Sequence, residues 1–333
     1  MNLGISKKYL ALAFVAARAC FFQARKQSGI ESIQALEATR TILLFDPEHL
    51  TAANHRKRHL LHLFSSHPSS TFQTALRRDL LVITSILTSP LHRQSKSPTL
   101  WHHRYWLLTT YASDFPSEPK EISVSSPPSH IPLVCADIDA VCKAGERHPK
   151  NYYAWQYARR LISFFTEGAY ACCEPKSTAS ANASNVEKGY ADLMGTCVAM
   201  VLSWSLHHPA DISGWAFLGW FLRCSSKDIT LPSPSRAQST VSTLAVVKCV
   251  GDYAVRLEQA KESLWVFLRT VLADGTVGEG GTEEIIGQLK DAGRKSDHGS
   301  GDCMILKERV RRTVAWVEKN SIRGNWGDTS HET

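Results

Sequence analysis

The sequence predicts an all-α protein, a right-handed α-α superhelix of stacked helical hairpins. Three observations support this fold class. Apolar residues recur with helical periodicity along most of the 333 residues, the alternation typical of strands is scarce, and four segments begin alike. A single hairpin cannot bury its apolar face alone, so neighbouring hairpins are expected to stack into a tetratricopeptide-like solenoid.

Helical periodicity and polar stretches define the expected elements. We expect helices over residues 7–26, 30–44, 51–64, 71–88, 98–112, 133–146, 151–167, 187–206, 211–224, 241–272 and 304–320. Stretches rich in Ser, Pro, Gly or charge lie at 113–131, 174–186, 225–238 and 273–302. The predicted organisation is a helical-hairpin repeat domain over 1–272, a flexible loop over 273–302, a C-terminal helix over 303–322 and a tail over 323–333.

The composition excludes several classes of protein. Hydrophobic residues make up 43% and charged residues 21%, which allows a packed core. The net charge of +7 is mild, and no Lys/Arg run is dense enough to predict nucleic-acid binding. No apolar run is long enough for a transmembrane span.

The N-terminal segment has two interpretations. Lys7 and Lys8 precede an apolar run, as in a signal peptide, and the sequon at Asn182 gives weak support for secretion. Alternatively, Arg18 and Arg25 continue the segment with helical periodicity, which favours an amphipathic helix.

The cysteines point to a reducing compartment. The chain has nine cysteines, an odd number, and no C-x-x-C pair. A disulfide framework and a structural zinc site are therefore both disfavoured. Most of the cysteines are expected to be small buried hydrophobic residues, and the expected location is the cytoplasm.

Four segments share one pattern, a Pro, then a polar cap, then a helix with an aromatic or small residue in its first turn. They lie at residues 45–61, 95–108, 147–162 and 207–222. The shared aromatic position holds Ala53, Trp101, Trp155 and Trp215, and the position three residues later holds Arg56, Arg104, Ala158 and Leu218. Within this pattern Asn151 and Asp211 are suitable helix caps.

The repeated side chains are expected to be structural. Each Trp is predicted to pack in the seam between hairpins, and Arg56 and Arg104 to pair with carboxylates of the neighbouring hairpin or of a partner. The pairs His102-His103 and His207-His208 are not expected to hold a metal, because adjacent helical residues point in different directions. Trp265 and Trp316 are expected to be core residues of a closing hairpin.

Two strings carry a resemblance to a known family: PKNYYAWQYARRL at 149–161 and SPTLWHHRYWLL at 97–108. They resemble the repeats of protein prenyltransferase alpha subunits, whose pattern is a Pro or Lys, then Asn-Tyr-x-x-Trp-x-x-Arg. The sequence is most similar to the divergent protein prenyltransferase alpha subunit repeat-containing proteins. The resemblance covers roughly residues 30–225, with 45–61 and 207–222 as degenerate repeats.

The resemblance implies an alpha-type subunit that is not active alone. In that family a crescent of helical hairpins wraps around a beta subunit, an α/α barrel that holds the catalytic zinc. The beta subunit transfers a farnesyl or geranylgeranyl group from its diphosphate to the C-terminal Cys of an acceptor such as a small GTPase. This chain is therefore expected to bind no cofactor of its own, with zinc, and magnesium as a further candidate, in the beta subunit.

The resemblance also assigns candidate residues for the isoprenoid diphosphate at the subunit interface. Lys96 matches a family Lys that approaches the diphosphate, Tyr152 a family Tyr, and Lys150 and Tyr153 flank it in the same turn. Pro98 stands where the family has a Tyr, and Tyr153 where it has a His. These departures put a direct catalytic contribution in doubt more than they do the scaffold.

A non-catalytic helical-repeat scaffold for protein–protein interaction is the alternative function. Helix-pair solenoids commonly bind peptides on one face, and the basic balance would suit an acidic tail. The two functions differ in one structural expectation. Convergence of Lys96, Lys150 and Tyr152 on one rim would favour the prenyltransferase subunit, and their dispersal would favour the scaffold.

Overall fold

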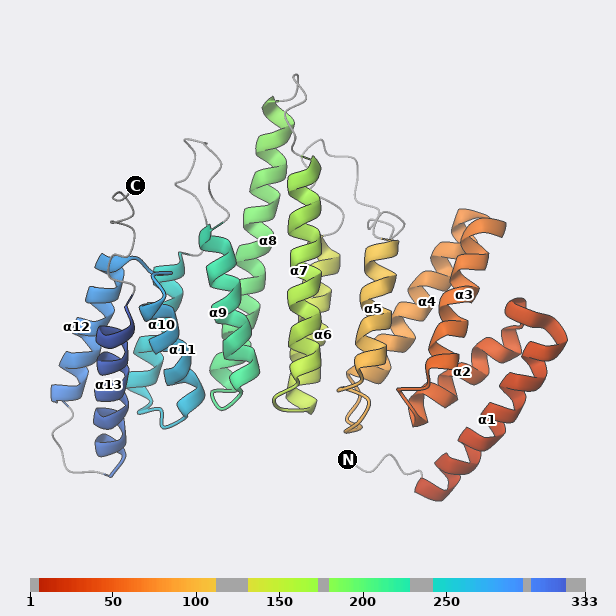
Figure 1. Ribbon diagram of the computed structural model, residues 1–333, viewed down its shortest axis with the longest axis horizontal. Helices are drawn as coiled ribbons and strands as arrows, with labels where there is room; N and C mark the ends of the chain where they lie inside the picture. Colours follow the sequence, from red (N-terminus) through yellow and green to blue (C-terminus); the bar gives the residue numbers. More distant parts are fainter. Residues whose placement is uncertain (1–5, 112–130, 173–179, 228–241, 296–300, 322–333) are drawn as a thin grey trace, which may run out of the picture. The chain divides into compact units, whose positions relative to one another are not determined.

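The computed structural model describes residues 6–111, 131–172, 180–227, 242–295 and 301–321, and all regular elements in these ranges are helices (Figure 1). The all-α prediction is confirmed. The chain divides into two compact units, Met1–Gly189 and Tyr190–Thr333, where the sequence had suggested one repeat domain over 1–272. No helix in the described ranges is long and apolar enough to cross a membrane.

The helices follow one another as hairpins. The first unit contains α1 (Lys7–Ser28), the 3-10 turn η1 (Gly29–Glu31), α2 (Ile33–Phe45), α3 (Leu50–Ser66), α4 (Ser69–Leu87), α5 (Pro98–Thr110), α6 (Ile131–Arg147) and α7 (Tyr152–Cys172). Helix α8 (Ser180–His207) spans the division between the units. The second unit continues with α9 (Ile212–Lys227), α10 (Thr243–Arg256), α11 (Glu262–Ala273), α12 (Glu279–Lys295) and α13 (Gly301–Asn320).

Two expectations about the C-terminal part were wrong. The expected single helix over 241–272 is two helices, α10 and α11. The expected flexible loop over 273–302 contains α12, whose Ile285 and Leu289 lie one turn apart and are both buried. This helix was missed because it buries only a narrow apolar stripe. Its other positions are mostly glycines and charged residues, which are typical of a loop.

The structure describes only parts of the polar stretches that the sequence predicted to be loops. Helix α8 begins at Ser180, inside the stretch 174–186 that was expected to be a loop. Most of 113–131 and 225–238, and the tail 323–333, lie outside the described residues.

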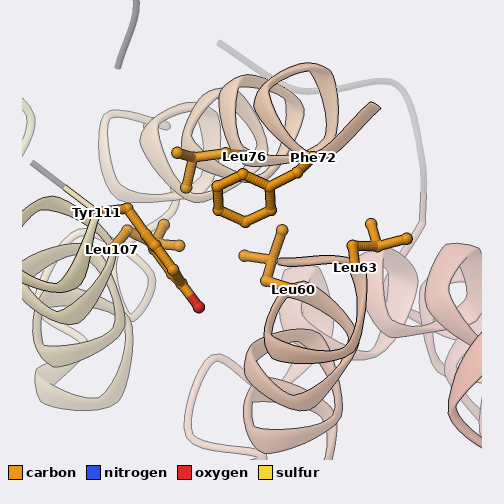
Figure 2. Close-up of a cluster of buried hydrophobic side chains, with 6 residues drawn as sticks. All are labelled: Leu60, Leu63, Phe72, Leu76, Leu107 and Tyr111. Atoms are coloured by element: carbon orange, nitrogen blue, oxygen red, sulfur yellow. The ribbon is translucent and has the colours of Figure 1, made fainter. Parts of the chain in front are cut away.

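The hairpins of the first unit form two layers. Helices α2, α4 and α6 are neighbours in the first layer, and α3, α5 and α7 are neighbours in the second layer, with α1 packed on α2. Figure 2 shows the apolar cluster that joins α3, α4 and α5. It consists of Leu60, Leu63, Phe72, Leu76, Leu107 and Tyr111, whose burial stabilises the stacking of neighbouring hairpins.

The second unit repeats the two-layer plan. Helix α11 packs between α9 and α13, and α10 packs against α12. Trp265 is fully buried on α11, as expected. Trp316 is not a core residue, because it is 48% exposed on α13, with the Arg269 guanidinium 5.7 Å from its ring centre.

Candidate functional site

The starts of α5, α7 and α9 are each fixed by a polar cap and a buried tryptophan. Asn151 accepts a hydrogen bond through Oδ1 from the backbone N–H of Ala154, and Asp211 accepts in the same way from Gly214. Trp155 lies four residues after Asn151 and is 1% exposed. The cap therefore sets the first turn, and the tryptophan anchors that turn in the core.

Three tryptophans also donate a hydrogen bond to the backbone segment that precedes their helices. The indole N–H of Trp101 donates to the carbonyl of Ser95 at 2.9 Å, and that of Trp215 donates to the carbonyl of Pro209 at 3.1 Å. Trp265 donates to the carbonyl of Gln259 at 2.6 Å, with the same six-residue offset. Helix α11 therefore starts another copy of the repeat. The sequence pattern missed it because neither a Pro nor a typical cap precedes this tryptophan.

Two arginines of the repeat bridge neighbouring hairpins. Arg56 donates from Nε to Asp79 Oδ1 at 2.6 Å and from Nη1 to Thr39 Oγ1 at 2.8 Å. It thereby joins α3 to both α2 and α4. The role predicted for Arg56, pairing with a carboxylate of the next hairpin, matches this geometry.

Arg104 repeats this arrangement one hairpin later. Its Nε donates to Asp137 Oδ1 at 2.6 Å, and its Nη1 donates to Thr84 Oγ1, so α5 is joined to α4 and α6. Both Arg104 and Asp137 are nearly inaccessible to solvent. A buried guanidinium and a buried carboxylate compensate each other only when paired in this way.

Each aspartate also holds a ring from the following second-layer helix. His103 Nε2 lies 2.9 Å from Asp79 Oδ2, and the Tyr157 hydroxyl donates to Asp137 Oδ1. An Arg–Asp–ring series thus runs through the hairpins of the first unit. The sequence did not single out Asp79 or Asp137, because a lone Asp in an amphipathic helix is usually a surface residue.

Burial and neighbouring groups shift the pKa values of several side chains in this series. Burial raises the pKa of Asp79, but the Arg56 charge and the His103 hydrogen bond outweigh it and lower the pKa to about 2. Burial lowers the pKa of His103 despite the nearby Asp79. Burial and Asp137 raise the pKa of Tyr157 well above its ordinary value. At neutral pH Asp79 is therefore ionised beside a neutral His103, and Tyr157 keeps its proton.

The predicted diphosphate residues lie on two turns that contact each other. Lys96 precedes α5 and Lys150 precedes α7, where Lys150 has a φ of 58°. Asn151 donates from Nδ2 to the carbonyl of Ser95 at 2.8 Å, and these two residues are the chain neighbours of Lys150 and Lys96. The structure thus brings both lysines to one edge of the first unit.

The two tyrosines begin α7 on the same edge. Tyr152 is 59% exposed and Tyr153 is 43% exposed, and their ring centres lie 5.8 Å apart. Both phenol rings are accessible to a ligand.

The same turns carry two histidines that sequence reasoning missed. The ring centres of His92 and His148 lie 3.9 Å apart. Burial lowers the pKa of His148, and the charges of Lys96 and His92 lower it further, against a backbone hydrogen bond to Pro149. We call Lys96, Lys150, Tyr152, Tyr153, His92 and His148 the basic edge. Ammonium, imidazole and phenol groups together suit a polyanion such as a diphosphate.

In each of the two histidine pairs that are adjacent in the sequence, His102-His103 and His207-His208, the two rings have different surroundings. His103 is buried against Asp79, whereas His102 is exposed. The Nδ1 atoms of His207 and His208 lie 2.7 Å and 2.8 Å from the carbonyl oxygens of Ser203 and Trp204. Within the described ranges, no three His, Cys, Asp or Glu side chains come close enough to hold a metal ion.

The fold and the repeated contacts define a protein of stacked helical-hairpin repeats. Residues 135–165 match the family model of the protein prenyltransferase alpha subunit repeat, over α6 and α7 with Asp137, Asn151 and Trp155. This segment therefore matches the repeat of that family, and the resemblance seen in the sequence is confirmed at residues 135–165. No curated protein matches the chain in sequence.

Proposed function

We propose that this chain is the alpha-type subunit of a heterodimeric protein prenyltransferase. It would hold a beta subunit that transfers a farnesyl or geranylgeranyl group to a protein Cys. The observation that carries the proposal is the prenyltransferase alpha subunit repeat at residues 135–165. Within this family, the chain would be most similar to the divergent protein prenyltransferase alpha subunit repeat-containing proteins.

The basic edge supports a role beside the isoprenoid diphosphate. Negative charge develops on the diphosphate as it leaves the isoprenoid, and a positioned cation stabilises that charge. Lys96 and Lys150 are the cations that the contact between the two turns holds on this edge. Zinc in the beta subunit would stabilise the acceptor Cys as a thiolate. This chain would contribute only side chains that contact the diphosphate.

Co-expression with each candidate beta subunit of the source organism tests the proposal. We expect a stable one-to-one complex that transfers an isoprenoid to an acceptor with a C-terminal Cys. Within that complex, Lys96→Ala should slow transfer at least about tenfold. Lys143→Ala, on the exposed face of α6, is the matched control and should leave the rate unchanged.

A non-catalytic repeat scaffold is the second candidate. Pro98 and Tyr153 favour it, because they replace a Tyr and a His that the family places at the diphosphate. A folded, helical chain that forms no complex with any beta subunit would refute the prenyltransferase proposal. A stable complex that transfers no isoprenoid would instead support the scaffold.

A further inference from the structure

Cations and aromatic rings alternate on one partly exposed face of the second-layer helices in the first unit. The face takes Lys57 from α3, His102, Tyr105 and Trp106 from α5, and Arg160 from α7. We call these five residues the basic-aromatic face. They are distinct from the basic edge and from the buried Arg–Asp–ring series.

The rings hold the long cations in place. The Lys57 ammonium lies 5.3 Å from the ring centre of Trp106, and the Arg160 guanidinium lies 4.3 Å from that of Tyr105. These are cation–π distances. Each cation comes from a different helix than its ring, so the stacking of the hairpins creates the face. Its charged groups are pre-positioned, which lowers the entropy cost of binding a partner.

Among the residues that the structure describes, Lys57, His102 and Arg160 have no acidic partner. None of the ion pairs in the described part of the chain includes Lys57, His102 or Arg160. Burial lowers the pKa of His102, and the charges of Lys57, Arg160 and His103 lower it further. Burial also lowers the pKa of Lys57. Partial desolvation without a carboxylate leaves a positive potential that an external anion would neutralise.

We propose that the basic-aromatic face docks an acidic segment of a partner protein, one in which carboxylates alternate with apolar side chains. The carboxylates would pair with Lys57 and Arg160 and accept a hydrogen bond from His102, and the apolar side chains would pack on Tyr105 and Trp106. Two cations and a histidine spread over three helices favour such a short segment over a nucleic acid, whose continuous phosphate backbone needs a denser basic track. This docking does not depend on prenyl transfer.

Fluorescence anisotropy on the full chain tests the docking. The probe is a short labelled peptide in which glutamates alternate with leucines, and a peptide with glutamines in place of the glutamates is its control. The unaltered chain should bind the acidic peptide and not the glutamine peptide. The double variant Lys57→Gln/Arg160→Gln should weaken binding about tenfold, because it removes both cations that would pair with the glutamates.

A matched variant separates this face from general charge effects. Arg18→Gln/Arg77→Gln also removes two exposed cations, and Arg18 lies 5.7 Å from the ring of Phe22. This control should bind the acidic peptide as the unaltered chain does. Equal weakening by both double variants would overturn the proposal, as would no binding by the unaltered chain. Tighter binding of a single-stranded oligonucleotide of equal charge would overturn it in favour of nucleic acid.

A second measurement needs no variant. NMR titration of the histidine rings of the unaltered chain follows His102 directly. The acidic peptide should raise the pKa of His102, because carboxylates would then oppose Lys57 and Arg160. A pKa of His102 unchanged at saturating peptide would contradict docking on this face even if the variants fail to fold.

Discussion

The first unit is expected to be sensitive to the loss of one member of a buried ion pair. Arg104→Ala leaves the Asp137 carboxylate buried without its guanidinium partner. We expect a loss of about 3 to 5 kcal/mol in the free energy of unfolding, measured by urea denaturation. Lys143→Ala, in the exposed pair with Asp139, should cost less than about 1 kcal/mol. Equal costs for the two variants would contradict the expected penalty of leaving the Asp137 carboxylate buried and unpaired.

The double variant Arg104→Met/Asp137→Leu separates the pair from its isolated members. Replacing both charges by apolar side chains removes the unpaired carboxylate, and this exchange is often nearly neutral. It should therefore recover much of the stability lost in Arg104→Ala. The Tyr157 hydroxyl, which donates to Asp137, loses its acceptor in this variant and limits the recovery.

His55 is expected to make the first unit sensitive to acid. Burial, followed by the charge of Arg25, lowers the pKa of His55 to about 4 from an ordinary 6.5. Between these values the unfolded chain binds more protons, so stability is full above pH 6.5 and falls as the pH drops toward 4.

His55→Gln removes this titration. The difference in unfolding free energy between pH 6.5 and about pH 4 should shrink by about 1 kcal/mol, allowing for solvent screening. Urea denaturation at both pH values measures it. An unchanged slope in His55→Gln would contradict the assignment.

At the scale of elements, one glycine sets how closely α8 and α9 approach. A Cβ at Gly214 would lie 2.5 Å from Cζ3 of the Trp204 ring. Gly214→Ala should therefore force the indole to shift and cost about 1 to 3 kcal/mol. Thermal unfolding followed by circular dichroism measures the change.

Gly251 in α10 is the matched control for this clash. A Cβ there would meet only Ile285 Cγ2, at 4.0 Å. Gly251→Ala should be neutral or stabilise the protein by up to about 1 kcal/mol, because alanine favours the helical backbone. If both alanine variants stabilise the protein, the close approach at Gly214 is not limiting.

The elements also show where sequence patterns succeed. Broad apolar stripes and Pro-plus-cap starts predicted α3, α5, α7 and α9 well, because each helix buries a wide face. Helix α12 escaped the pattern, since only Ile285 and Leu289 of its described residues are nearly inaccessible.

For the whole molecule, the division into two units predicts unfolding in more than one step. Calorimetry should show two transitions, because separate compact units lose structure independently. Arg104→Ala should lower the midpoint of one transition, and Gly214→Ala that of the other. A single two-state transition shifted by both variants would show that the units unfold as one.

The sequence by itself determined the all-helical class, the starts of the repeats at Trp101, Trp155 and Trp215, and the family resemblance. These follow from short-range patterns of caps and apolar spacing. Only the tertiary structure decided that Asp79 and Asp137 hold the buried arginines, and that Lys57 meets Trp106. Such contacts join residues of different helices, and the stacking of the hairpins, not the local spacing, sets which side chains meet.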